Sequence, residues 1–414
     1  MMQNDDSARG GVPPSPAPGA LLVNARARRG AYPAELAPTL SRSAGQEAMQ
    51  TISAWRGYGS TPLVPLPALA SREGVARIDY KQESGRFGLG SFKALGGAYA
   101  VLRLLARLAS AEAGRAVGED EIAAGAFAAL AARTTVCCAT DGNHGRSVAW
   151  GGAMFGCRVV IFVHATVSEG RAEAIRRYGA EVIRTRGNYD DSVREAARMA
   201  AENGWHVVSD TSYPGYTEVP RDVMQGYSVM AEEAMAQLEA PPTHIFVQGG
   251  VGGLAAAVIA TFWEACGAQR PLITVVEPVS AACLLESARA GVPAVVTGDL
   301  DTIMAGLACG EPSLIAWPVL ERGADAFEMI ADDAAAETMR LLASGEAGAR
   351  LVAGESGVAG LAGFLALDSA GRATLGIGAG SRILVFGSEG DTDPEVYRQI
   401  TGESGDALRA KGAI

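Results

Sequence analysis

The sequence predicts an α/β protein with two open, twisted lobes, each built on a parallel sheet. Short apolar stretches alternate with stretches of helical periodicity along most of the 414 residues. This alternation is typical of strands and helices arranged around a parallel sheet. It occurs in two separate runs, which indicates two sheets. A chain of this length is long enough for each lobe to have its own core.

The first run predicts the smaller lobe. Ser168 is suited to cap a helix over 168–178, and residues 190–201 begin with acidic residues, which favour a helix N-terminus. The strands expected around these helices are 136–139, 158–163, 181–184 and 206–208. Strand and helix therefore alternate regularly through this part of the chain.

The second run predicts the larger lobe, with a helix from Leu254 onward. Its expected strands are 244–247, 273–276 and 383–386. We expect residues 21–104 and 223–414 to form this large domain and residues 105–222 to form the small α/β domain. Residues 1–20 carry four prolines among Gly, Ser and Ala, so a disordered N-terminal tail is expected there.

The composition excludes several classes of partner. The chain has 35 Lys and Arg against 46 Asp and Glu, a formal charge of -11. Nucleic acids and anionic membranes bind clustered Lys and Arg, and no such cluster is present. No apolar run reaches the roughly 18 residues of a membrane helix, and no secretory signal is visible at the N-terminus. We expect a cytoplasmic protein with a small-molecule substrate and no nucleic-acid or membrane partner.

The cysteines and histidines indicate neither a disulfide framework nor a metal site. Six cysteines are few for so long a chain. Cys283 and Cys309 flank one long segment and could approach one another, although a disulfide is unusual in a reducing cytoplasm. The four histidines stand far apart without a cysteine partner, so no protein-built metal site is expected.

A glycine-rich segment between an expected strand and a helix is suited to bind phosphate. It reads Gly249, Gly250, Val251, Gly252 and Gly253, and we call it the glycine cup. Glycines let the backbone approach an anion closely, and the N–H groups at a helix N-terminus point toward it.

Two alternatives stay open for the cup. The glycines could merely form a tight turn. Alternatively, the pattern Gly250-x-Gly252-x-x-Ala255 fits a dinucleotide-binding turn, with Glu277 as the acid that binds the ribose. The second alternative would make the protein an NAD-dependent dehydrogenase.

A second glycine-rich segment, residues 85–97, contains Lys93. It is not a nucleotide-binding P-loop, because no glycine directly precedes the lysine and no Ser or Thr follows it. The neighbours Phe87, Phe92 and Leu95 would desolvate the ammonium and lower its pKa, as a Schiff-base lysine requires. The alternative, a solvated surface lysine, is disfavoured by these neighbours.

A third segment follows the expected strand 136–139 and contains Thr140, Asp141, Gly142, Asn143 and His144. In open α/β sheets, ligands bind outside the carboxyl ends of the strands. The segment is therefore well placed to bind a ligand. The alternative is an ordinary Asp-Gly-Asn turn.

Together these three segments resemble the fold type II pyridoxal-phosphate enzymes, the tryptophan synthase β-like family, over about residues 55–400. The resemblance implies pyridoxal 5'-phosphate as cofactor, with Lys93 as its Schiff-base lysine and Phe92 beside it. It implies that the glycine cup binds the phosphate. Ser388, in Phe386-Gly387-Ser388, would lie near the pyridine nitrogen.

In the same family, a loop of the form Ser-x-Gly-Asn-His-Gly binds the substrate carboxylate. The resemblance thus implies substrate-binding roles for Thr140, Asp141, Gly142 and His144, and a bond from Asn143 to the phenolic oxygen of the cofactor.

The sequence also resembles the diaminopropionate ammonia-lyase family more narrowly. The segments that carry this likeness include 86–97, 139–146, 224–227, 302–307 and 389–393. The resemblance implies conversion of 2,3-diaminopropionate to pyruvate and two ammonia, through an aminoacrylate intermediate, by a homodimer. The cup departs from this pattern, since Gly249 to Leu254 reads more like the wider family.

Two aspartates support a cationic substrate. Asp141 stands where the wider family has a small or hydroxyl residue, and it would provide a base on the face of the cofactor opposite Lys93. We hypothesise that Lys93 deprotonates the L isomer and Asp141 the D isomer. Asp141 and Asp210 would favour the protonated β-amino leaving group. Asp210 could instead only cap a turn. For the enzyme as a whole, the alternative activity is that of a serine/threonine-type dehydratase.

Overall fold

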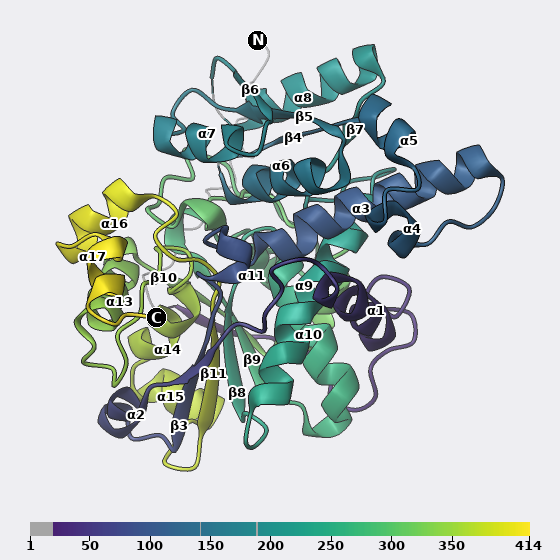
Figure 1. The fold of residues 1–414 in the computed structure, drawn as a ribbon. Coiled ribbons are helices and arrows are strands. Elements are labelled where there is room, and N and C mark those ends of the chain that lie inside the picture. Colours follow the sequence, from purple (N-terminus) through teal and green to yellow (C-terminus); the bar gives the residue numbers. More distant parts are fainter. Residues whose placement is uncertain (1–19, 141, 188) are drawn as a thin grey trace, which may run out of the picture.

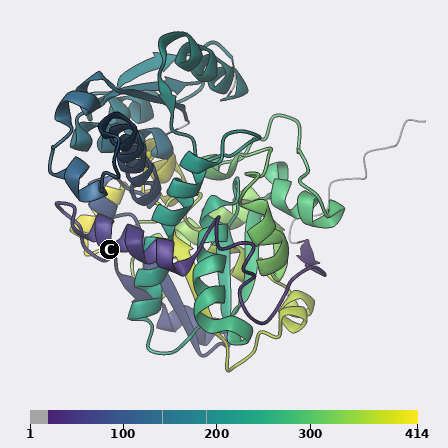
Figure 2. The same ribbon diagram turned by 90° about the vertical axis from the view of Figure 1, so that its right-hand side faces the viewer.

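The structure, a computed structural model, describes residues 20–140, 142–187 and 189–414. Its strands form a seven-stranded and a four-stranded sheet, which confirms the predicted α/β fold with two sheets. Figures 1 and 2 show the four-stranded sheet and its helices on one side of the molecule and the larger sheet on the other. The boundaries of the two domains stay a prediction.

The seven-stranded sheet has the order β1-β10-β9-β8-β11-β3-β2. The outermost strands, β1 and β2, pair antiparallel with their neighbours, and the five strands between them are parallel. The strands are β1 (Leu21–Val23), β2 (Leu63–Pro65), β3 (Arg77–Gln82), β8 (His244–Gln248), β9 (Leu272–Pro278), β10 (Ala326–Ile330) and β11 (Arg382–Gly387). The carboxyl ends of β8 and β11 lead directly to the glycine cup and to Ser388.

The four-stranded sheet has the order β6-β5-β4-β7, and all its strands are parallel. The strands are β4 (Thr135–Ala139), β5 (Arg158–Val163), β6 (Glu181–Arg184) and β7 (His206–Val207). Each lies within one residue of its predicted bounds. The third candidate segment follows the carboxyl end of β4, as the sequence predicts.

Helices cover both sheets (Figure 1). They are α1 (Arg42–Ser53), α2 (Pro67–Glu73), α3 (Lys93–Ala113), α4 (Glu119–Ala123), α5 (Ala128–Arg133), α6 (Asn143–Phe155), α7 (Glu169–Arg176), α8 (Tyr189–Asn203), α9 (Glu218–Gln237), α10 (Gly253–Cys266), α11 (Cys283–Ala290), α12 (Trp317–Gly323), α13 (Asp332–Ser344), α14 (Ala359–Ala366), α15 (Ser369–Leu375), α16 (Pro394–Thr401) and α17 (Gly405–Ala410). Ser168 caps α7 by accepting a hydrogen bond from the Arg171 N–H.

Helix α3 passes between α6 and α9 and is largely buried there. Gly96 makes the close approach to α9 possible, because a Cβ on it would lie 2.4 Å from the Tyr227 ring. Gly97 does the same toward α6, where a Cβ would lie 2.1 Å from the Ser147 hydroxyl oxygen. The first residue of α3, Lys93, is therefore fixed between both neighbours.

Helix α3 corrects one expectation about apolar runs. Among the described helices it is long and apolar enough, by length and composition, to cross a membrane. Most of it is buried inside the protein, as in the core helix of a globular domain. Arg103 and Arg107 interrupt its apolar residues, so a search for unbroken apolar runs in the sequence does not find a segment of this length.

Candidate active site

Lys93 lies at the N-terminal end of α3 with its side chain largely buried. Its Nζ donates a hydrogen bond of 2.6 Å to Asp210 Oδ2. The ring centroids of Phe92 and Tyr227 are 5.4 and 5.5 Å from the same nitrogen. The surface-lysine alternative is thereby excluded, since an ion pair and two rings enclose the ammonium.

The electrostatics differ from the sequence expectation. Burial disfavours the Lys93 ammonium, but the Asp210 carboxylate and Tyr227 together outweigh burial, so the Lys93 pKa is raised. The prediction of a lowered pKa is therefore wrong for the protein without its cofactor. Burial likewise opposes the charge on Asp210, yet Lys93 and His144 hold the Asp210 pKa well below its usual range. The apolar neighbours were visible in the sequence, and Asp210 was expected at the site, but its pairing with Lys93 was not predicted.

His144 joins this cluster from α6. Its Nε2 lies 2.8 Å from the Val208 carbonyl oxygen, and its Nδ1 lies 3.8 Å from Asp210 Oδ2. Three of the predicted site residues, Lys93, His144 and Asp210, are thus neighbours although they come from different elements.

Thr140 and Gly142 shape the turn into α6. The Thr140 hydroxyl oxygen accepts hydrogen bonds from the N–H groups of Gly142, at 3.0 Å, and Gly145, at 3.2 Å. The alternative interpretation of this segment, an ordinary turn, is therefore correct in part. Asp141, the predicted second base, lies outside the described residues, and its role stays a prediction.

Asn143 begins α6 and connects the turn to the end of β11. Its Nδ2 donates a hydrogen bond of 2.5 Å to Glu389 Oε2. Glu389 also accepts hydrogen bonds from the Thr392 hydroxyl and the Ser356 N–H. Asn143 thus lies beside Ser388, the other residue expected to contact the cofactor ring.

The glycine cup has the backbone that an anion site needs. Gly250 and Gly252 have φ of +66° and +97°, which L side chains rarely adopt. A Cβ on Gly252 would lie 2.5 Å from Leu320 Cδ1, and one on Gly249 would lie 2.6 Å from Glu277 Cγ. The cup ends at Gly253, the first residue of α10, so its N–H groups and the helix N-terminus suit a phosphate.

Cys283 lies against the cup, with its Sγ 3.6 Å from the Gly250 carbonyl oxygen. Cys309 lies nearby, because its Sγ would be 3.9 Å from a Cβ on Gly250. Cys309 acts on the pKa of the Cys283 thiol, so the two cysteines lie near one another, and neither forms a disulfide.

Glu277 is not available to bind a ribose. Its side chain is buried, and its two carboxylate oxygens accept hydrogen bonds from the N–H groups of Leu284, at 2.9 Å, and Leu285, at 2.8 Å. Glu277 therefore caps the N-terminal turn of α11. The dehydrogenase alternative loses the residue on which it depended.

Ser388 offers a hydroxyl to a ring nitrogen. Gln248 Nε2 donates a hydrogen bond of 2.5 Å to Ser388 Oγ, which leaves the hydroxyl hydrogen free to be donated. The Ser388 carbonyl oxygen accepts from the Phe92 N–H at 3.0 Å. A buried hydroxyl, a phosphate cup and an enclosed lysine are what pyridoxal phosphate requires, so these residues fit that cofactor.

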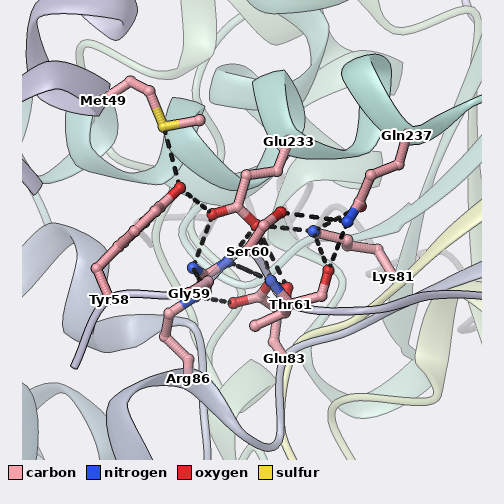
Figure 3. Close-up of polar contacts among 10 residues, drawn as sticks. All are labelled: Met49, Tyr58, Gly59, Ser60, Thr61, Lys81, Glu83, Arg86, Glu233 and Gln237. Atoms are coloured by element: carbon pink, nitrogen blue, oxygen red, sulfur yellow. Dashed lines mark hydrogen bonds and ion pairs between the residues drawn. The ribbon is translucent and has the colours of Figure 1, made fainter. Parts of the chain in front are cut away.

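A buried network of four charged residues supports the segment before Lys93 (Figure 3). Arg86 donates hydrogen bonds to both carboxylate oxygens of Glu83 and of Glu233. Lys81 donates to Glu233 Oε2 at 2.7 Å. All four side chains are at most 1% exposed. The network joins β3 and α9 to the 3₁₀ turn Arg86–Gly88, which leads into α3.

A fold with two such sheets, and a site of this composition, define a pyridoxal-phosphate enzyme. The chain belongs to the family of pyridoxal-phosphate dependent enzymes, whose family model matches residues 54–387.

Within that family, the chain is similar to diaminopropionate ammonia-lyases. The Salmonella typhimurium protein of that name is 40% identical over 379 residues, which cover 87% of this chain and 92% of that protein. This match confirms the narrower resemblance seen in the sequence.

Solved structures agree. A crystal structure of Escherichia coli diaminopropionate ammonia lyase in complex with an aminoacrylate-PLP azomethine reaction intermediate has a TM-score of 0.82 at 35% identity, covering 92% of this chain and 96% of that one. A crystal structure of the same enzyme in complex with D-serine has a TM-score of 0.84 at 34% identity, covering 94% and 98%.

Sequence reasoning missed Tyr227, Gln248 and Glu389 as neighbours of the site. It also missed a signal in the composition. The chain has only three lysines, Lys81, Lys93 and Lys411. Lys81 is used in the buried network, and Lys411 is exposed near the C-terminus and pairs with Glu403. A count of the lysines would have left few candidates for the Schiff-base lysine, even without the glycine-rich motif around Lys93.

Proposed function

We propose that this enzyme catalyses the α,β-elimination of 2,3-diaminopropionate, from both the D and the L isomer, with water to give pyruvate and two ammonia. The observation that carries the proposal is the Lys93–Asp210 pair, 2.6 Å apart, beside the phosphate cup and Ser388. The names of the relatives at 34 to 40% identity support the substrate.

The residues divide the work as follows. Pyridoxal phosphate, when bound, supplies an electron sink for the electrons of the broken Cα–H bond. Lys93 Nζ takes the α-proton of the L isomer, and Asp141 takes that of the D isomer from the opposite face. Ser388 donates a hydrogen bond to the ring nitrogen without adding a full charge, which favours elimination over transamination.

The acidic neighbours suit a substrate that carries a β-ammonium group. A β-amino group leaves readily only as an ammonium. Lys93 and His144 depress the pKa of Asp210. A substrate ammonium that takes the place of the Lys93 ammonium would keep the carboxylate ionised in the same way. Serine carries a neutral hydroxyl at this position and gains nothing from the carboxylate.

The second candidate is a dehydratase that acts on serine or threonine. Binding of D-serine by the similar E. coli enzyme favours it as a weaker activity of the same site. A β-hydroxyl fits wherever a β-ammonium fits, so we expect D-serine to bind. We expect little turnover, because the Asp210 carboxylate does not help a neutral hydroxyl to leave.

Steady-state pyruvate formation from each isomer of diaminopropionate, beside D- and L-serine and L-threonine, tests the proposal. We expect kcat/KM for diaminopropionate to exceed that for serine by about 10²-fold or more, in line with the loss of one charged contact in a polar site. Comparable values for serine would contradict the proposal.

Asp141→Asn tests the division between isomers. We expect it to reduce kcat for the D isomer by about 10²-fold to 10⁴-fold, as loss of a general base does, with a much smaller effect on the L isomer. Equal losses on both isomers would rule out the two-base scheme.

We also propose that the enzyme is a homodimer of the cytoplasm. The resemblance supports the dimer, and the six free thiols suit a reducing compartment. Light scattering after size-exclusion chromatography measures the mass, for which we expect twice 42.5 kDa. A monomer at micromolar concentration would contradict the dimer.

A further inference from the structure

Glu389 is a buried carboxylate that directly follows Ser388, just after β11. Its Oε2 accepts hydrogen bonds from Asn143 Nδ2, at 2.5 Å, and from the Thr392 hydroxyl, at 3.0 Å. Its Oε1 accepts one from the Ser356 N–H, at 3.0 Å. Burying a carboxylate is costly unless its oxygens are satisfied. Here three uncharged donors from three segments satisfy them and hold the carboxylate in one orientation.

The backbone of Glu389 is held as firmly as its side chain. The Gly354 N–H donates a hydrogen bond of 3.0 Å to the Glu389 carbonyl oxygen. A Cβ on Gly357 would lie 2.6 Å from the same oxygen, so the segment 354–357 packs directly on Glu389. Ser91, in the segment that leads into α3, forms an antiparallel β-bridge with Glu389. The carboxylate therefore has a fixed place beside the start of α3.

Asn143 lies on the face of α6 that packs against the start of α3. It is one helical turn from Ser147, so the two residues share a face of α6. The Ser147 hydroxyl donates a hydrogen bond of 2.6 Å to the Lys93 carbonyl oxygen. Figure 1 shows α6 beside α3. The contact between Asn143 and Glu389 is therefore made next to the site of Lys93.

The carboxylate of Glu389 selects one orientation of the Asn143 amide. A carboxylate only accepts hydrogen bonds, so the amide nitrogen must face it. If the amide oxygen faced Glu389, two acceptors would meet and the hydrogen bond would be lost. One N–H of the amide is used in this contact. The second N–H is on the same nitrogen, and the described residues provide no other acceptor for that nitrogen, so it is left to a ligand.

We propose that Glu389 is a positioning residue that fixes the Asn143 amide with its second N–H directed at the phenolic oxygen of pyridoxal phosphate. The inference deepens the proposed function, because it rests on the cofactor contact that the family resemblance implies for Asn143. A hydrogen bond donated to the phenolic oxygen favours its ionised form. Bound cofactor with an ionised phenol absorbs in the visible, and with a neutral phenol in the near ultraviolet. The ratio of the two bands therefore reports the orientation of the amide.

The test compares absorption spectra of Glu389→Gln, Asp391→Asn and wild-type holoenzyme at one pH. Glutamine keeps the shape of the side chain but donates as well as accepts, so the Asn143 amide can adopt either orientation. We expect the ratio of visible to near-ultraviolet absorbance to fall about 3-fold to 10-fold in Glu389→Gln, the equilibrium factor of one net hydrogen bond.

Asp391→Asn is the matched control, since Asp391 is in the same segment and pairs with Arg409 instead. We expect it to keep the wild-type ratio. A wild-type ratio in Glu389→Gln, or equal losses in the two variants, would overturn the proposal.

A double variant with Asn143→Ala separates an effect through Asn143 from an effect of the Glu389 charge on the cofactor. Asn143→Ala removes the donor, so we expect the ratio to fall at least as far as in Glu389→Gln. If Glu389 acts through Asn143, adding Glu389→Gln to Asn143→Ala lowers the ratio no further. A further fall in the double variant would mean that Glu389 acts on the cofactor directly, and would overturn its role as a positioning residue.

Thr392→Val keeps the proposal testable if Glu389→Gln does not fold. Valine has the shape of threonine and lacks the hydroxyl that donates to Glu389 Oε2. The carboxylate is then held less firmly, and we expect a smaller fall of the ratio in the same direction. In that case, a wild-type ratio in Thr392→Val would overturn the proposal.

The spectra also separate this proposal from the proposed function, because they do not depend on turnover. If wild type forms no pyruvate from diaminopropionate, the proposed function fails, and the absorbance ratios still decide the role of Glu389. If wild type forms pyruvate and Glu389→Gln keeps the wild-type ratio, the proposed function stands and the positioning role of Glu389 is overturned.

Discussion

At the scale of single residues, the ion pair of Lys93 and Asp210 decides the chemistry of the cofactor lysine. Only the neutral amine attacks an aldehyde, and the Asp210 carboxylate favours the ammonium. Burial acts in the opposite direction and lowers the Lys93 pKa, while Tyr227 raises it together with Asp210, so loss of the Asp210 carboxylate would bring the pKa down from its present level. Asp210 thus favours the protonated form of Lys93.

We therefore predict that Asp210→Asn shifts cofactor incorporation to lower pH. The measurement is the rate at which apoenzyme regains its visible absorption with pyridoxal phosphate, as a function of pH. The pH at half-maximal rate is expected to fall relative to wild type, because a lowered Lys93 pKa leaves more neutral amine at each pH.

Asp222→Asn is the matched control, since Asp222 is a buried carboxylate that pairs with Arg107 and does not act on Lys93. It is expected to leave the profile unchanged. A profile that moves with Asp222→Asn but not with Asp210→Asn would contradict this account of the lysine.

The site residues differ in how far the sequence predicts them. Lys93 stands out by its glycine-rich and apolar neighbours, and Ser388 by its resemblance to a family pattern. The pairing of Lys93 with Asp210 was hidden, because 117 residues separate them and no local pattern encodes that contact. Gln248 was hidden for a related reason: it reads as the last residue of a buried strand, and its contact with Ser388 depends on the pairing of β8 with β11.

At the scale of elements, the buried network fixes the turn that begins α3. Two cations and two carboxylates satisfy one another there, out of contact with water. Removing one partner of such a group leaves an uncompensated buried charge, which typically costs about 3–5 kcal/mol.

We predict that Glu233→Gln lowers the free energy of unfolding by about 3–5 kcal/mol, because Lys81 and Arg86 both lose a carboxylate. Urea-induced unfolding followed by circular dichroism measures the change. Its neighbour Glu232 pairs with Arg42, whose side chain is 37% exposed, so Glu232→Gln should cost less than about 1 kcal/mol. Similar midpoints for the two variants would show that the network does not stabilise this region.

The elements of the smaller sheet were predicted well because β4 and β5 are mostly apolar and continuous and because helices alternate with its strands along the chain. Strand β3 escaped prediction because it reads Arg-Ile-Asp-Tyr-Lys-Gln and its polar residues are buried with partners. Asp79 pairs with Arg77 on the same strand, and Lys81 pairs with Glu233 of α9. Strands β1 and β2 have three residues each, too few to show a period. The order of the strands could not be predicted from the sequence either, since it depends on contacts between distant segments.

At the scale of the whole molecule, Glu328 makes stability depend on pH. It lies buried on β10, and neither carboxylate oxygen has a hydrogen-bond partner among the described residues. Burial raises its pKa to about 9, against about 4.3 in an unfolded chain. Between these values the folded state binds the proton more tightly, so its stability falls as pH rises, by up to about 1.4 kcal/mol per pH unit.

We predict that Glu328→Gln flattens this dependence between about pH 5 and pH 9, because glutamine has no proton to lose. Thermal unfolding midpoints across that range measure it. Glu337→Gln, at an exposed position on α13, is expected to keep the slope of wild type. An unchanged slope in Glu328→Gln would contradict the assignment to this carboxyl.

The central claim is that Lys93 binds pyridoxal phosphate. Reducing the holoenzyme with borohydride fixes the cofactor to its lysine, and peptide mass spectrometry then identifies which of the three lysines carries it. The account predicts loss of the visible absorption band and the added mass on Lys93 alone. The added mass on Lys81 or Lys411, or on no lysine, would contradict it.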